Sequence, residues 1–327
     1  MQTPDLGRTT RLLERWFSRH QRPLPWRSGY DPYRVWVSEV MLQQTRMEVV
    51  LPFFARFMQR FPDLASLAKA TDDDVTTAWS GLGYYRRAKM LRAGAVAVVE
   101  RFDGVIPADV EKLLTIPGIG RYTAGAIASI AFEQRAPIVD GNVARVLSRL
   151  FAHAGDAWPL AERMVHASQS PRALNQSLME LGALICKPRN PTCLVCPVHD
   201  ECVARATGRI DELPPAKPKK VTRELTIPLY LIRDRRGRVL MRRASGTLMD
   251  AMYHLPHGDT SLLAGEPFTT DNRELLGTFR HTVTTRKIEF VVYAARAPRK
   301  PAGYEWIADV SAVPHPSYVR KAMALES

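Results

Sequence analysis

Two acidic residues lie in settings where a carboxylate could carry out acid–base chemistry. Glu39 is embedded in the apolar segment VWVSEVML, so its carboxyl group must be paired, reach water through a cleft, or be partly protonated. Gln43 follows one helical turn later on the same predicted face. Asp140 follows the apolar segment PIV and precedes Gly141 and Asn142, near the start of a predicted helix. The structural alternatives are an ion pair at a helix edge for Glu39 and a helix N-cap for Asp140.

All the cysteines of the chain lie within 17 residues, at the spacing C-x6-C-x2-C-x5-C. Four thiolates so close together are typical of a metal site or an iron–sulfur cluster, and no cysteine elsewhere is available for a disulfide framework. Spacing alone leaves zinc as an alternative. The cysteines are Cys186, Cys193, Cys196 and Cys202, and Lys187 and Arg189 lie in the first interval, where they could bind a phosphate.

A proline–glycine turn is predicted to join two short helices in the segment LLTIPGIGRYTAGAI. Pro117 blocks continuation of the first helix, and we expect Gly118 and Gly120 to adopt the positive φ values of a tight hairpin. The second helix, from Arg121, would begin with free backbone N–H groups beside this turn, which is a natural phosphate site. The alternative is a turn that only joins two core helices.

Two aromatic segments have residue types suited to contact unstacked bases. Trp26 and Arg27 follow two prolines in RPLPWR, and Leu82 and Tyr84 lie in the turn GLGYYRR. Aromatic rings stack on bases and arginines neutralise phosphates, so the combination is typical of proteins that open a duplex. Each segment has an alternative role as part of a hydrophobic core.

The elements that must position these residues are predicted to be helices. Apolar residues recur with helical spacing, and start signals such as Asp31–Pro32 begin several segments. The predicted helices cover residues 8–20, 33–45, 46–61, 64–70, 72–79, 87–101, 143–151 and 173–185.

The chain of 327 residues is long enough for two or three domains, and its 46 Lys and Arg against 33 Asp and Glu give a net charge of +13. This excess suggests a polyanionic partner such as nucleic acid. No apolar run approaches the ~20 residues that span a bilayer, and the N-terminus has no hydrophobic signal core. We therefore expect a protein of the cytoplasm or nucleoid with no membrane partner.

A change of composition after the last cysteine marks a second region. The segment LPPAKPKK begins a basic, proline-rich linker assigned to residues 213–224. Beyond it, LTIPLYLI and RVLMRR flank the turn DRRG and are predicted to pair as a hairpin, and KIEFVVYAA is a further strand. The sequence predicts an α+β domain over residues 225–327.

Six motifs follow one another in a family-specific order: LPWR, SEVMLQQT, GLGYYRRA, IPGIGRYTAGAI, VDGNVARVLSRL and the cysteine spacing. Over roughly residues 8–205 they resemble the MutY-type adenine DNA glycosylases of the helix-hairpin-helix, endonuclease III superfamily. The last domain resembles, more weakly, the MutT-like domain that such proteins carry at the C-terminus.

This resemblance implies a multidomain fold. An all-α helix-hairpin-helix glycosylase core with a [4Fe–4S] loop would occupy residues 1–212, followed by the linker and an α+β MutT/Nudix-like recognition domain. Within the core, a six-helix barrel would span about residues 28–135, and residues 1–27 and 136–212 would form an iron–sulfur subdomain.

The implied activity is removal of adenine mispaired with 8-oxoguanine or guanine in double-stranded DNA, by a monomer. The nucleotide must be flipped out of the helix, and departure of adenine builds oxocarbenium character on the sugar. Glu39 matches the family's acid that protonates adenine, and Asp140 matches the carboxylate that stabilises or transiently bonds the sugar carbon. Tyr122 stands where lyase members carry a catalytic lysine, so we expect a monofunctional glycosylase.

The resemblance also implies which residues contact DNA. The adenine pocket would be lined by Trp26, Arg27, Tyr122 and Gln176. The gap at the partner base would be filled or probed by Gln44, Leu82 and Tyr84. A backbone phosphate, together with a monovalent cation, would be held by Gly118 and Gly120, and the cluster would serve DNA binding.

Two departures from the family pattern concern the C-terminal domain. Relatives have a Phe-Ser-His triplet that reads 8-oxoguanine, whereas this chain has Val283, Thr284 and Thr285, of which Thr284 retains the hydroxyl. The acidic helix of true MutT hydrolases is missing between Gly258 and Gly277. We therefore expect this domain to recognise DNA and not to hydrolyse nucleotides.

Two other functions fit part of the pattern. An endonuclease III-like glycosylase/lyase for oxidised pyrimidines would need an amine where Tyr122 stands. A non-enzymatic module that binds damaged DNA or a nucleotide would not need the carboxylate of Glu39.

Overall fold

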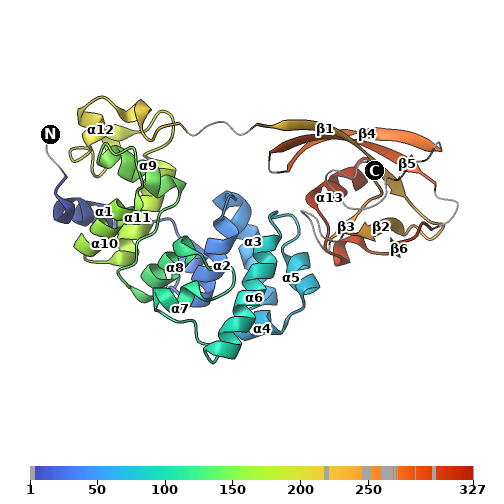
Figure 1. Ribbon diagram of the computed structural model, residues 1–327, viewed down its shortest axis with the longest axis horizontal. Coiled ribbons are helices and arrows are strands. Elements are labelled where there is room, and N and C mark those ends of the chain that lie inside the picture. The colour runs from blue at the N-terminus through green and yellow to red at the C-terminus, as the bar shows by residue number, and fades with distance from the viewer. Residues whose placement is uncertain are drawn as a thin grey trace. The chain divides into compact units, whose positions relative to one another are not determined.

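Figure 1 shows the protein as a computed structural model, which describes residues 4–216, 221–244, 252–258, 268, 270, 272–283, 285–296 and 300–326. Contacts between residues divide the chain into two compact units. The helical unit comprises residues 1–69 and 90–217, and the mixed unit comprises residues 70–89 and 218–327.

The helical unit contains most of the helices, and the sequence predicts all of them except those at residues 158–167 and 203–206, where no helix was expected. They are α1 (Leu6–His20), α2 (Pro32–Leu42), α3 (Met47–Arg60), α4 (Leu64–Lys69), the greater part of α6 (Arg86–Arg101), α7 (Val110–Leu114), α8 (Arg121–Ala126), α9 (Gly141–Leu150), α10 (Trp158–Ala167), α11 (Pro171–Leu184) and α12 (Val203–Ala206). Among the described residues, no helix combines the length and the apolar character needed to cross a membrane.

One core of the helical unit forms around α11, which packs against α1, α9 and α10 (Figure 1). The apolar side chains of these helices, including Leu174, Leu178 and Leu181 of α11, are buried together. The start of α9 approaches α11 closely because residue 182 is a glycine. A Cβ atom on Gly182 would lie 2.6 Å from the Cβ of Asn142, so any side chain there would push the two helices apart.

Helix α2 packs against α8 and against the π-helical turn Ile127–Ala131, which continues α8. Asp31 caps α2, since its carboxylate accepts a hydrogen bond from the amide of Arg34 at 2.9 Å, which confirms the predicted start. The helix ends at Leu42, earlier than the predicted residue 45. Gln44 lies beyond this end, in the left-handed region with φ of 57°.

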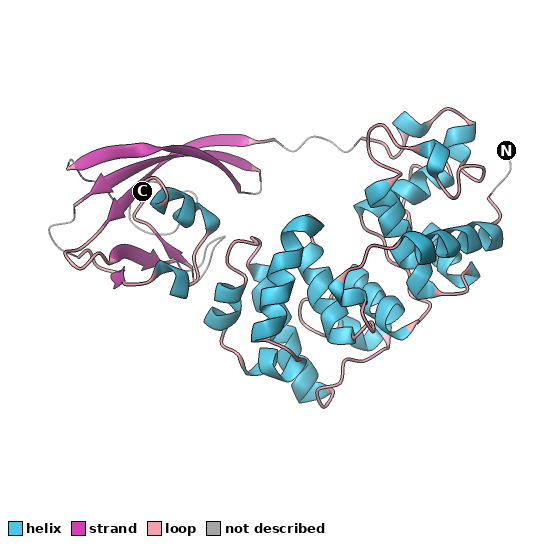
Figure 2. Ribbon diagram, turned by 180° about the vertical axis from the view of Figure 1, so that it is seen from behind, coloured by secondary structure: helices cyan, strands magenta, loops and turns pink. Residues whose placement is uncertain are grey.

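The mixed unit contains the strands, drawn in magenta in Figure 2. Its elements are α5 (Asp72–Ala78), β1 (Arg223–Ile232), β2 (Val239–Arg243), β3 (Tyr253–His254), β4 (Arg273–Val283), β5 (Arg286–Ala295), β6 (Tyr304–Ile307) and α13 (Ser317–Met323). The predicted α+β character of the C-terminal region is confirmed.

The strands form two three-stranded sheets, in the orders β1–β5–β4 and β3–β2–β6. The predicted hairpin of β1 with β2 is wrong, because the two strands belong to different sheets. An isolated antiparallel bridge joins Arg233, just after β1, to Val239 of β2, whereas β1 pairs along its length with β5 in parallel. The apolar faces of both sheets enclose one core with α13, whose Tyr318 stacks on Phe290 at a centroid distance of 4.7 Å.

Candidate active site

Glu39 lies in the middle of α2, with only 5% of its surface exposed. The hydroxyl of Tyr122 donates a hydrogen bond to Glu39 Oε2 at 2.7 Å. The pKa of Glu39 is raised to about 7, mainly by burial and also by the negative charge of Asp140, although the Tyr122 hydrogen bond and the positive charge of Arg27 lower it. A carboxyl group with such a pKa can hold and release a proton near neutral pH.

Tyr122 comes from α8, the second helix of the predicted hairpin. Its hydroxyl also lies 3.4 Å from the Sδ atom of Met179 on α11. Burial raises the pKa of Tyr122 well above its usual value, and the charges of Glu39 and Asp140 act in the same direction. The phenol therefore stays protonated and serves as a hydrogen-bond donor to Glu39.

Asp140 is the N-cap of α9, so the structural alternative for this residue is confirmed. Its carboxylate accepts hydrogen bonds from the amide of Val143 at 2.7 Å and from Asn142 Nδ2 at 3.1 Å. The same carboxylate is half-buried and close enough to Glu39 and Tyr122 for its charge to affect the pKa of both. Capping a helix therefore does not exclude a second role beside Glu39.

Arg27 and Gln176 form a hydrogen-bonded pair, with Arg27 Nε donating to Gln176 Oε1 at 2.9 Å. Trp26, beside Arg27 in a short 3-10 helix (Pro25–Arg27), is 5% exposed and packs edge-on against Phe54. Trp26 is therefore part of the hydrophobic core, which was the alternative role for this residue. Arg27 and Gln176 come from segments far apart in the chain, and the positive charge of Arg27 reaches Glu39.

The residues expected at the partner base differ in exposure. Tyr84 is 47% exposed and has φ of 52°, whereas the side chain of Leu82 is 6% exposed. Gln44 is exposed, and Gln43 donates from Nε2 to the hydroxyl of Thr123 at 3.4 Å. Thr284 lies outside the described residues.

The proline–glycine turn is a hairpin between α7 and α8, as predicted. Gly118 has φ of 81°, and a Cβ atom there would lie 2.8 Å from the Cβ of Met90, so glycine is required on both grounds. The prediction for Gly120 is wrong, because its φ is −97°. Gly120 is the N-cap of α8, and a Cβ atom on it would meet nothing within 4 Å. Its lack of a side chain leaves the backbone open at the helix start, and it is not needed for the turn itself.

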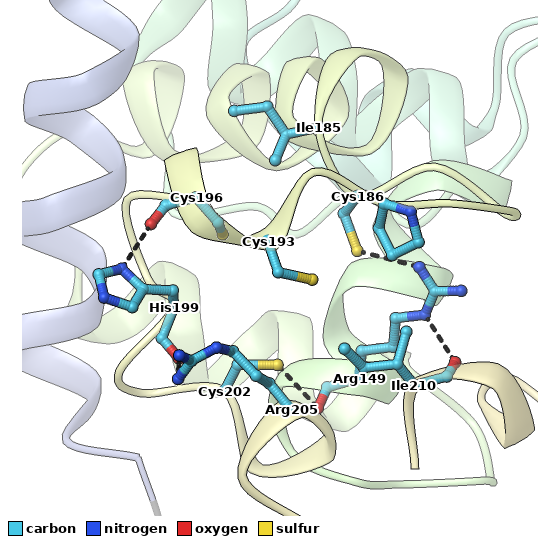
Figure 3. Close-up of a pocket in the computed structure, with 10 residues that line it drawn as sticks. Arg149, Ile185, Cys186, Cys193, Cys196, His199, Cys202, Arg205 and Ile210 are labelled. Atoms are coloured by element: carbon cyan, nitrogen blue, oxygen red, sulfur yellow. Dashed lines mark hydrogen bonds between the residues drawn. The ribbon is translucent and has the colours of Figure 1, made fainter. Parts of the chain in front are cut away.

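The four cysteines surround one cavity of about 30 Å³, as Figure 3 shows. Arg149 lies at its edge and donates from Nη1 to Cys186 Sγ at 3.5 Å and to the carbonyl of Lys187 at 2.7 Å. Across the described ranges, no set of three or more His, Cys, Asp or Glu side chains meets at one point suited to a single metal ion. Lys187 and Arg189 are exposed beside the cavity.

Two residues of this region were not found from the sequence. Arg145 donates to Asn142 Oδ1 at 2.8 Å and to the carbonyl of Cys186 at 2.8 Å, and so joins the neighbour of Asp140 to the first cysteine. Glu180 pairs with Arg27 at 3.0 Å. The sequence indicates these two residues only weakly. Glu180 lies one helical turn after Gln176, and Arg145 lies one helical turn before Arg149.

Comparison with known families matches residues 37–171 to the HhH-GPD superfamily of base excision DNA repair proteins. Two of the solved structures that resemble the chain serve as examples. A thermostable thymine-DNA glycosylase has a TM-score of 0.57 at 27% identity, over 62% of this chain and 97% of the other. Endonuclease III in a non-covalent DNA complex has a TM-score of 0.53 at 22% identity, over 62% and 96% of the two chains, and supports the fold alone.

Relatives in sequence include adenine DNA glycosylases. The protein from Rattus norvegicus is 44% identical over 231 residues, which cover 64% of this chain and 45% of the rat protein. The protein from Buchnera aphidicola subsp. Schizaphis graminum is 33% identical over 263 residues, which cover 77% of this chain and 76% of that protein. The chain thus spans less than half the length of its rat relative but three quarters of the bacterial one. On that bacterial match, the chain belongs to the adenine DNA glycosylase family.

Proposed function

We propose that the protein is a monofunctional DNA glycosylase that excises adenine mispaired with 8-oxoguanine or guanine. The observation that carries the proposal is the meeting of two acids from distant parts of the chain. Glu39 is buried with a pKa of about 7 and bonded to Tyr122, and the charge of Asp140 acts on both. The relatives are named adenine DNA glycosylases, and from these names we infer that the excised base is adenine.

The proposed reaction divides the work between these acids. Adenine is a poor leaving group, so Glu39, in its protonated form, donates a proton to the flipped base as the N-glycosidic bond breaks. The sugar gains positive charge at the anomeric carbon, and the Asp140 carboxylate stabilises this charge or bonds transiently to that carbon. Water completes the hydrolysis and leaves an abasic site.

Tyr122 supports hydrolysis without strand cleavage. A lyase needs an amine that forms a Schiff base with the opened sugar, and a phenol cannot form one. The buried hydroxyl of Tyr122 instead donates to Glu39. We therefore infer that the protein releases adenine and leaves the strand intact.

The partner base and the DNA backbone would be contacted by other residues. Tyr84 and Gln44 are exposed and suited to probe the partner base, and the open backbone at Gly120 is suited to a phosphate, with a monovalent cation nearby. Preference for 8-oxoguanine rests on the family resemblance alone, and Val283, Thr284 and Thr285 depart from the family where relatives read this lesion. We expect a monomer that acts on double-stranded DNA in the cytoplasm, at the nucleoid.

We also infer that the four cysteines hold a [4Fe–4S] cluster. Thiolates are the ligands such a cluster takes, and the four surround a cavity instead of converging on one ion. The cationic groups of Arg149 and Arg205 line the same cavity and would offset the negative charge of a thiolate-ligated cluster. Bound, the cluster would order the loop between Cys186 and Cys202. Analysis of iron and sulfide in the purified protein tests this directly.

The decisive experiment is single-turnover release of adenine from duplexes with 8-oxoguanine, guanine or thymine opposite. We expect release opposite 8-oxoguanine and guanine, and near-abolition by Glu39→Gln and Asp140→Asn. Borohydride should trap no covalent adduct, because no amine is present at Tyr122. Absence of adenine release by the native protein, or efficient trapping, would contradict the proposal.

A further inference from the structure

Glu180 is a buried carboxylate that the proposed chemistry does not use. It lies on α11, one helical turn after Gln176, and only 2% of its surface is exposed. A buried carboxylate is costly unless charged partners and hydrogen bonds compensate its loss of water. Its partners therefore indicate what it does.

Two arginines hold the Glu180 carboxylate. Oε1 accepts from Arg22 Nε at 2.5 Å, and Oε2 accepts from Arg22 Nη2 and from Arg27 Nη2, each at 3.0 Å. Burial acts to raise the pKa of Glu180, but the hydrogen bonds and charges of Arg22 and Arg27 outweigh it and lower the pKa. Glu180 is therefore a carboxylate anion bridging two guanidinium groups.

Arg27 is fixed on every side that the structure describes. Besides Glu180, its guanidinium donates from Nη1 to the carbonyl of Arg22 at 2.9 Å and from Nε to Gln176 Oε1 at 2.9 Å. It also lies over the ring of Phe17, 5.0 Å from the centroid. Glu180 is the only anionic partner among these contacts, so it supplies the charge that keeps this buried arginine in place.

The arginine in turn determines the orientation of the Gln176 amide. A guanidinium only donates, so the atom that faces Arg27 Nε must be the carbonyl oxygen of Gln176. The amide nitrogen is therefore directed the other way, 3.3 Å from the carbonyl of Arg172 and 3.5 Å from the hydroxyl of Tyr30. Without Arg27 the amide could turn over and present its oxygen instead.

We propose that Glu180 is a positioning residue that holds Arg27, and through Arg27 the Gln176 amide, in the arrangement that receives the flipped purine. The proposal rests on the proposed function, in which Arg27 and Gln176 line the adenine pocket. In this arrangement each side chain has one orientation, because Glu180 holds the Arg27 guanidinium and the guanidinium directs the Gln176 amide.

The test is single-turnover kinetics of Glu180→Gln and Glu180→Asp on a duplex with adenine opposite 8-oxoguanine. Glutamine keeps the shape but loses the charge, and aspartate keeps the charge on a shorter side chain. We expect Glu180→Gln to slow excision at saturating enzyme by about 100-fold, the cost of a misplaced pocket group, and Glu180→Asp to slow it less. Affinity for the uncleaved duplex should change little, because backbone contacts dominate it.

A double-mutant cycle separates positioning from general stability. If Glu180 acts through Arg27, Glu180→Gln should cause no further slowing in an Arg27→Met protein. A matched control is Glu14→Gln, which alters a carboxylate that holds the other end of α11 through the amides of Gln169 and Ser170. This control should leave the excision rate unchanged.

Three results would overturn the inference: no slowing by Glu180→Gln, equal slowing with and without Arg27, or slowing by Glu14→Gln of the same size. If Glu180→Gln does not fold, Glu180→Asp in the native and Arg27→Met backgrounds gives the same comparison. Failure of the native protein to release adenine would instead contradict the proposed function, so the two failures are distinguishable.

Discussion

The middle of α2 and the start of α9 each present one carboxyl group, and the two surroundings are opposite. Glu39 lies inside a helix among apolar side chains, with one hydrogen bond from Tyr122, and burial raises its pKa to about 7. Asp140 lies at a helix N-terminus, half-buried, and accepts hydrogen bonds from Val143 and Asn142. The two carboxyl groups thus differ in burial and in their hydrogen-bond partners.

This difference indicates how, in the proposed reaction, two carboxyl groups would supply a proton and a negative charge. A buried carboxyl group without a cationic hydrogen-bond partner favours its neutral form. A carboxylate at a helix N-terminus, facing backbone amides, is stabilised as an anion by the helix dipole. The anion of Asp140 in turn raises the pKa of Glu39. In the proposed reaction the two groups would therefore reinforce each other's roles, in the way that paired carboxylates do in glycoside hydrolysis.

The largest expected effect is that of Glu39→Gln. Glutamine has the shape of the neutral acid but no transferable proton, so single-turnover adenine release should fall by about 1,000-fold. Duplex affinity should persist. The control is Glu48→Gln, which changes an exposed glutamate at the start of α3. An unchanged rate constant for Glu39→Gln would remove this group from the chemistry.

Asp140→Asn tests whether the start of α9 does more than cap a helix. Asparagine is as good an N-cap as aspartate, so the free energy of unfolding should change by less than about 1 kcal/mol. Adenine release should nevertheless fall by about 100-fold, because the charge that stabilises the sugar cation is gone. Asp5→Asn, at the N-cap of α1, is the matched control and should alter neither property. If the variant released adenine at the native rate, Asp140 would be a helix cap only.

Tyr122→Phe should shift the pH profile of the reaction. The active form of Glu39 is protonated, so the rate constant should decline above about pH 7. The Tyr122 hydrogen bond lowers the pKa of Glu39, and its loss should move the decline to higher pH, by up to about one unit. Tyr33→Phe removes another buried hydroxyl, bonded to the carbonyl of Phe61 at 2.9 Å, and should leave the profile in place. A shift to lower pH would contradict the account.

The last expected effect is on stability instead of on the reaction rate. The pKa of Glu39 is about 7 in the folded protein against 4.5 as its ordinary value, so the folded state holds a proton that the unfolded state has lost between these pH values. Stability should therefore fall as the pH rises from 4.5 to 7, by about 3 kcal/mol in all. Denaturant unfolding of native and Glu39→Gln proteins at pH 5 and pH 8 tests this. The variant should gain relative to the native protein at pH 8, and a pH-independent difference would refute the assignment.

Local signals in the sequence predicted most of the helices, two of their caps and the burial of Glu39. Asp31 and Asp140 cap helices where expected, and the cysteines surround a single cavity. Glu39 is buried, as its apolar neighbours indicate. These features depend on neighbours within a few residues, which is the range over which periodicity and capping operate.

Features that depend on distant partners were not predicted. The pairing of β1 with β5 joins segments some 60 residues apart. The sequence of β1 does not indicate which strand it pairs with, so the predicted local hairpin was wrong. Glu180 is explained only by Arg22 and Arg27, more than 150 residues away. Gly120 was misread because glycine also occurs where open space, and not a positive φ, is needed.

The most direct test of the central claim is titration of the Glu39 carboxyl group by NMR of carbon-13-labelled glutamate side chains, in the native and Asp140→Asn proteins. The account predicts a pKa of about 7 for Glu39 in the native protein and a lower pKa when Asp140 loses its charge. A native pKa near 4.5, or a pKa that does not respond to Asp140→Asn, would contradict the claim that these two acids share one site.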